Sequence, residues 1–155
     1  MTTIAKSPVT RIAANVATFL FAVTIILQLL LAAGILPITM AWGGRQSVLT
    51  TSLRIASLVA VIVLGSFIYI IRRRAGLIGV EPPSTFNKIM AWLVTGFLAL
   101  NTLGNLSSQS RLETIVFAPI TVLLVVSCLV VSISRSDKRS QPEPDVAPSP
   151  EEIME

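Results

Sequence analysis

Four long apolar stretches, separated by short polar connections, constrain the fold of this chain more than any other feature. They cover approximately residues 12–36, 53–71, 89–106 and 115–133, and none has Asp, Glu, Lys, Arg or His in its central part. Each is close to the ~20 residues that an α-helix needs to cross ~30 Å of hydrocarbon. Inside lipid the backbone must satisfy its own hydrogen bonds, and the alternating polarity of membrane strands is absent. The sequence therefore predicts an all-α membrane protein with four transmembrane helices in a compact bundle.

The composition argues against other classes of protein. Hydrophobic residues make up 53% of the chain and charged residues 13%, whereas soluble domains average roughly 45–50% and about 25%. A disulfide-rich secreted scaffold is excluded because Cys128 is the only cysteine. The first apolar stretch is longer than the ~7–15 residues of a signal-peptide core. We therefore expect it to be a permanent first helix.

The Lys and Arg residues predict how the bundle is oriented. Nine of the twelve lie before the first stretch, between the second and third, or after the fourth. Short loops rich in Lys and Arg stay on the cytoplasmic side, so both termini are expected to be cytoplasmic. The topology determinants are Arg72, Arg73 and Arg74, directly after the second stretch. These predictions place a multi-pass protein in the cell (inner) membrane, with its basic rim on anionic lipid headgroups. A nucleic-acid partner is not expected.

The C-terminal segment differs in kind from the rest of the chain. Residues 140–155 contain five acidic residues and four prolines but no basic residue. Such a segment cannot bury enough apolar surface to offset its ordering entropy. We therefore expect a transmembrane domain over residues 1–139 and a disordered, acidic, proline-rich cytoplasmic tail over residues 140–155. The tail or the helix faces are candidate contacts for a protein partner, and the oligomeric state is left open.

Carboxamide and hydroxyl side chains are the main polar groups of the apolar stretches. Gln28 lies in the outer half of the first, while Asn101 and Asn105 share one helix face in the third, with Ser108 three residues further on. An unpaired amide in hydrocarbon costs several kcal/mol. These four residues are therefore expected either to bond between helices or to line a polar pocket open to the outer side.

The loop after the first stretch contains an unusual run, Trp42, Gly43, Gly44 and Arg45. Two glycines permit a tight turn because they readily adopt positive φ angles. One interpretation is a turn with an interfacial tryptophan and an arginine that binds lipid headgroups. The other is a cap over the amide residues, with Arg45 facing an anionic ligand or Glu113.

The central parts of the apolar stretches contain no ionisable group, which argues against most membrane chemistry. Proton-coupled transport requires carboxylates or histidines at membrane depth. Metal sites and a Ser/His/Asp triad lack their residues, because the chain has no histidine and one cysteine. No catalytic, metal or cofactor site is therefore expected, and the chain is not expected to be an enzyme. The preferred function is packing or partner binding by a non-enzymatic membrane protein. The alternative is a small channel or transporter for a neutral or weakly charged solute.

Several short motifs together resemble a group of small prokaryotic four-span integral membrane proteins of unknown function. The motifs are Gly34, Pro37, Ala-Trp-Gly-Gly at 41–44, Leu-Arg-Ile-Ala-Ser at 53–57, Asn-Thr-Leu-Gly-Asn at 101–105, Ser108, Glu113 and Pro119. The resemblance covers roughly residues 20–130, and residues 36–39 depart from the more polar, glycine-containing turn expected there. It implies a fold and a membrane location but no activity.

Overall fold

The computed structural model describes residues 7–79, 84–111 and 113–134. Its four long helices are α1 (Pro8–Ala33), α2 (Thr51–Arg74), α3 (Thr85–Leu106) and α4 (Ala118–Ile133). Two short 3-10 turns, η1 (Ile38–Met40) and η2 (Trp42–Gly44), lie between α1 and α2, and a π-helical turn, η3 (Glu113–Phe117), leads into α4. With η3 included in the fourth, each helix is long and apolar enough to span a membrane. The predicted all-α bundle of four helices, each long and apolar enough to span a membrane, is confirmed. The predicted tail, residues 140–155, lies outside the described residues.

Local chemistry explains where the helices begin and end. The side-chain oxygens of Ser7, Thr50 and Ser84 accept hydrogen bonds from backbone N–H groups in the first turns of α1, α2 and α3, each over 3.3 Å. Gly34 ends α1 in a left-handed conformation with φ of 77°. By contrast, α2 continues through Arg74, beyond the predicted end at residue 71, because cations stabilise the negative end of a helix dipole.

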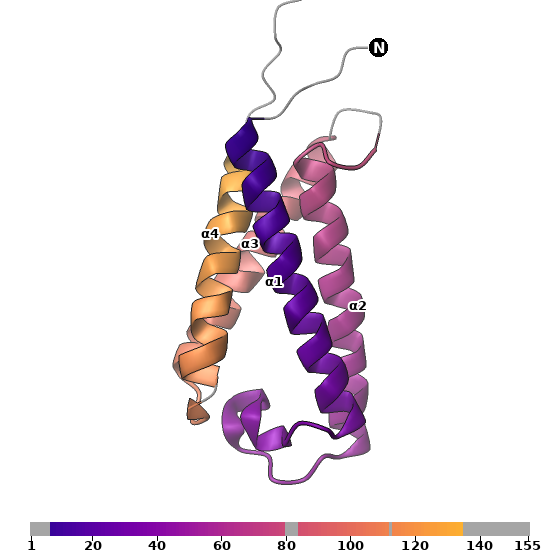
Figure 1. Ribbon diagram of the computed structural model, residues 1–155, viewed down its shortest axis with the longest axis vertical. Coiled ribbons are helices and arrows are strands. Elements are labelled where there is room, and N and C mark those ends of the chain that lie inside the picture. Colours follow the sequence, from indigo (N-terminus) through magenta and orange to yellow (C-terminus); the bar gives the residue numbers. More distant parts are fainter. Residues whose placement is uncertain (1–6, 80–83, 112, 135–155) are drawn as a thin grey trace, which may run out of the picture.

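The helices form an antiparallel ring in which α1 contacts α2 and α4, and α3 contacts α4 and α2. Among these four neighbouring pairs, the contacts are most extensive within the α1–α2 and α3–α4 hairpins and least extensive between α2 and α3. Figure 1 shows that the start of α1 and the end of α4 lie at one end of the bundle. We call this the terminal end. At the opposite end, which we call the loop end, α1 and α4 diverge and the η1–η2 segment lies beneath them (Figure 1).

The core in the terminal half of the bundle combines small and aromatic side chains with branched aliphatic ones. Ala14, Ala17 and Phe21 of α1 are fully buried. Phe67 of α2 packs edge-on against Phe21 and against Phe97 of α3, with centroid distances of 6.0 and 5.4 Å. Only 11% to 33% of the most apolar window of each helix is buried. Most apolar side chains therefore point outward, as expected for helices surrounded by lipid.

Arg74 has a structural role that the sequence analysis missed. Its side chain is only 7% exposed. Nη2 donates hydrogen bonds to the carbonyl oxygens of Ser132, over 3.3 Å, and Ser134, over 2.7 Å, at the end of α4. Arg72 instead donates to Oδ1 of Asn15 at a more exposed position, over 3.4 Å. The arginines thus lie at the terminal end, and the orientation predicted from them stays a prediction.

Candidate functional site

A cavity of about 740 Å³ lies in the loop-end half of the bundle. All four long helices contribute to its wall, together with η2 and η3. Its volume falls within the ~300–1,000 Å³ typical of small-molecule sites. Toward the terminal end it is bounded by Leu64, Phe97, Leu98 and Leu124, which lie next to the aromatic core. The cavity is therefore a vestibule in one half of the bundle, bounded by packed side chains toward the other half.

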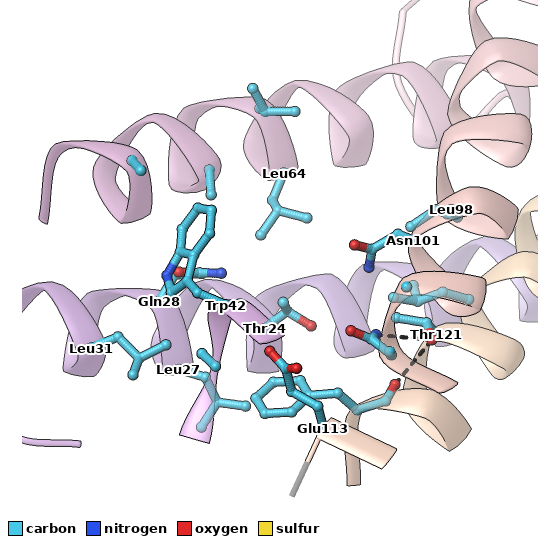
Figure 2. Close-up of a pocket in the computed structure, with 18 of the residues that line it drawn as sticks. Thr24, Leu27, Gln28, Leu31, Trp42, Leu64, Leu98, Asn101, Glu113 and Thr121 are labelled. Atoms are coloured by element: carbon cyan, nitrogen blue, oxygen red, sulfur yellow. Dashed lines mark hydrogen bonds between the residues drawn. The ribbon is translucent and has the colours of Figure 1, made fainter. Parts of the chain in front are cut away.

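The structure places three of the four predicted amide and hydroxyl residues on the cavity wall: Gln28 from α1, and Asn101 and Asn105 from α3. Asn101 is exposed toward the cavity (Figure 2). Nδ2 of Asn105 donates a 3.4 Å hydrogen bond to the hydroxyl of Thr121 on α4. For Asn105, bonding between helices and lining a pocket are therefore not alternatives, because it does both.

Ser108 lies apart from this group. Since α3 ends at Leu106, Ser108 no longer continues the helical face of Asn101 and Asn105. Its hydroxyl accepts a hydrogen bond from the backbone N–H of Ser110 over 3.0 Å, and it is not among the described residues that line the cavity. The sequence missed this because the predicted face assumed that the helix continued.

Only part of the loop run from Trp42 to Arg45 lines the cavity. Trp42 and Gly43 line the cavity, whereas Arg45 is exposed and is not part of the described wall. Gly44 completes the η2 turn. Trp42 has a φ of 58° and Gly43 a φ of 81°. Positive φ is uncommon for a bulky residue and costs about 1–2 kcal/mol. The turn therefore holds the indole at the cavity in a conformation that tryptophan rarely adopts.

Glu113 supplies the contact that holds this turn. The backbone N–H of Gly43 donates to both carboxylate oxygens, Oε1 and Oε2, each over 3.1 Å. The two residues are 70 positions apart in the sequence. The predicted contact between Arg45 and Glu113 is thus replaced by a contact from the backbone of a neighbouring residue.

The predicted start of the fourth apolar span, residue 115, needs correction to Glu113. The fourth span begins at this residue, and Glu113 is only 7% exposed. The predicted boundary at residue 115 excluded it, because an apolar run is delimited by its first charged residue. The sequence did contain a signal, since Glu113 lies two residues before an apolar run and is a predicted partner of Arg45.

The described cavity wall carries charge of one sign only. Among the described residues that line it, Glu113 is the only one with a charge. Its remaining polar groups are amides, hydroxyls, the Trp42 indole N–H and backbone groups, and most of the wall is apolar. Over the same part of the chain, no group of three or more Cys, Asp or Glu residues is placed to hold a metal ion.

Comparison of the chain with protein-family models, with curated proteins and with solved structures found no match. The resemblance to small prokaryotic four-span proteins therefore stays an expectation from the sequence. The described residues nevertheless form four long helices packed in a bundle, each long and apolar enough to cross a lipid bilayer.

Proposed function

We propose that this protein is a non-enzymatic, multi-pass membrane protein that binds a small solute in its loop-end cavity. The observation that carries the proposal is the cavity itself, which combines apolar walls with a few converging polar groups. This combination is typical of small-molecule sites. The alternative that the amide residues merely join helices does not account for Asn101, which is exposed toward the cavity.

The shape of the cavity favours one-sided binding over a continuous channel. Leu64, Phe97 and Leu98 bound it toward the terminal half, and Phe67 packs against Phe97 beyond them. A solute that crossed the membrane here would require these side chains to move. We therefore propose a binding vestibule, with transport as a further step only if the bundle opens at this layer.

The orientation forms part of the proposal. Arg72 and Arg73 lie at the terminal end with Arg74, and basic residues favour the cytoplasmic side. Both termini would then be cytoplasmic, and the cavity would open to the outer side of the inner membrane. The resemblance to a four-span group implies no activity and adds nothing to this assignment. Partner recruitment by residues 140–155 lies outside the described residues.

Thiol labelling tests the cavity and the orientation together. In a Cys128→Ala background, Asn101→Cys and Asn105→Cys would each be treated in intact cells with a membrane-impermeant thiol reagent. Leu100→Cys and Leu103→Cys serve as matched controls, because both lie on α3 and are strongly exposed on its apolar surface. The proposal expects labelling at 101 and 105 and protection at 100 and 103, since lipid excludes the hydrophilic reagent.

Two other labelling results would separate an error in the orientation from an error in the cavity. Labelling of positions 101 and 105 only in inside-out vesicles would reverse the orientation and leave the cavity intact. Complete protection of both positions from either side would contradict a solvent-accessible vestibule and, with it, the proposed function.

A further inference from the structure

We propose that the solute is a small organic cation, a quaternary or protonated amine, with Glu113 as its counter-ion and the Trp42 ring against its charged group. This inference rests on the proposed binding function and names the class of ligand. The burial and hydrogen bonding of Glu113, the sign of charge around the cavity and the chemistry of the remaining wall support it.

Glu113 has little hydrogen bonding for a buried carboxylate. An ionised carboxylate offers about four acceptor sites, and its two oxygens here share one described hydrogen-bond partner, the backbone N–H of Gly43. Burying a charge is costly unless the charge is paired and hydrogen-bonded. Figure 2 shows the carboxylate directed from η3 toward α1, into the cavity. The remaining acceptor sites therefore face the space that a ligand would fill.

The described cationic side chains of the neighbouring segments are not part of the cavity wall around Glu113. Arg45 and Arg111 are exposed, and neither belongs to the described wall. Nη2 of Arg54 lies 3.6 Å from the position of a Cβ built on Gly34, so this guanidinium is directed at the end of α1. A low-dielectric cavity with one carboxylate carries a negative potential, which attracts cations and repels anions. An ionisable residue within a membrane span commonly marks a ligand or ion site.

The rest of the wall suits an organic cation better than an inorganic one. Tryptophan provides the most favourable aromatic face for an ammonium group, and the left-handed backbone at Trp42 holds its ring at the cavity. Oε1 of Gln28 is buried and has no described hydrogen-bond partner, so it can accept from an N–H or O–H group of the ligand. Divalent ions such as Ca²⁺ require about six to eight oxygen ligands. A largely apolar wall with one carboxylate does not provide them.

The test uses three probes of nearly the same shape and different charge. Choline is the cation, 3,3-dimethylbutan-1-ol is its neutral carbon isostere and 3,3-dimethylbutanoate is an anion of similar size. The full-length protein carries Trp92→Phe and is held in maltoside micelles at constant ionic strength. Because the chain has two tryptophans, Trp42 is then the only one, and its fluorescence reports binding at the cavity.

The inference expects choline to bind at least tenfold more tightly than the alcohol, a difference of about 1.4 kcal/mol, with the anion weakest. Glu113→Gln keeps an acceptor for the N–H of Gly43 but removes the charge. It should bring choline to the affinity of the alcohol and leave the alcohol unchanged. Arg45→Gln, a charge change at an exposed loop position, should alter the affinity for choline less than about twofold, since exposed charges are strongly screened.

Three other results of the probe comparison are possible. Equal affinity for choline and the alcohol, or tighter binding of the anion, overturns the assignment of a cation and leaves a solute-binding cavity in place. Absence of binding by all three probes overturns the ligand class, and the thiol labelling at positions 101 and 105 decides separately whether the cavity is open to a solute. If Glu113→Gln fails to fold, the comparison of probes on the parent protein decides the question without it.

Discussion

Replacing Arg74 by methionine should destabilise the bundle far more than the same change at Arg72. Methionine retains much of the side-chain length while removing the charge and the donors. Both substitutions remove one positive charge from the same helix end, so their effects on membrane orientation are matched. The difference between them isolates the contact of Arg74 with the end of α4.

The hydrogen-bond distances of Arg74 set the expected loss in free energy of unfolding. Nη2 of Arg74 donates to the carbonyl oxygens of Ser134 at 2.7 Å and Ser132 at 3.3 Å. Hydrogen bonds to charged groups contribute about 1.5–3 kcal/mol each, and those of long geometry contribute less. A cation at a helix C-terminus adds about 0.3–1 kcal/mol. Against this, Nε of Arg74 is buried without a described partner, and hydrogen bonds between membrane helices average about 0.6 kcal/mol. We expect a net loss of about 2 kcal/mol.

Arg72 makes a single 3.4 Å bond to Asn15 at an exposed position, for which a loss of at most about 0.5 kcal/mol is expected. The assay is reversible unfolding in mixed micelles with increasing SDS, followed by helical circular dichroism. Free energies of unfolding that agree within about 0.5 kcal/mol for the two variants would refute the argument that Arg74 joins α2 to α4.

Two further pairs of substitutions test the packing and the loop turn in the same assay. Phe67→Ala should lower the free energy of unfolding by about 2–3 kcal/mol, because it removes the ring between two aromatic partners. Phe19→Ala, at a side chain that is 66% exposed, should lower it by less than about 1 kcal/mol. Equal losses for the two variants would contradict the aromatic core. Gly43→Ala should destabilise by about 1 kcal/mol solely through its φ of 81°, since nothing lies within 4 Å of the added Cβ. Gly65→Ala, which has equal space but lies inside a helix, should be neutral or stabilising by up to about 1 kcal/mol; a destabilised Gly65→Ala beside an unaffected Gly43→Ala would show that the turn is not strained.

Helix ends could be predicted only in part, and the errors have a common cause. The apolar run of the second span ends at Ile71, but the helix continues through Arg74, because a helix end is set by its hydrogen bonds and not by hydropathy. The same bias placed Glu113 outside the fourth span, although it is buried at its start. A charged residue beside an apolar run is assigned to water by default, and only its tertiary partners show otherwise.

The candidate site was accessible to sequence reasoning as a set of residue types but not as a geometry. Gln28, Asn101 and Asn105 attract attention because amides are costly in hydrocarbon, and all three lie on the cavity wall. Ser108 shared their predicted helical face and is separated from them because α3 ends first. Thr121, which accepts the bond from Asn105, has no distinguishing signal in a span where hydroxyls commonly bond to their own helix.

Four helices, each long and apolar enough to span a membrane, could be predicted from local sequence alone. Length and hydropathy are local properties, and a backbone in lipid has no other way to satisfy its hydrogen bonds over such stretches. Which polar groups contact one another depends on how the helices pack. The contact of Gly43 with Glu113 joins residues 70 positions apart, and that of Arg74 with Ser134 joins residues 60 positions apart. Such pairings depend on how the helices pack around one another, and packing is set by the shapes of many side chains at once, which no single segment encodes.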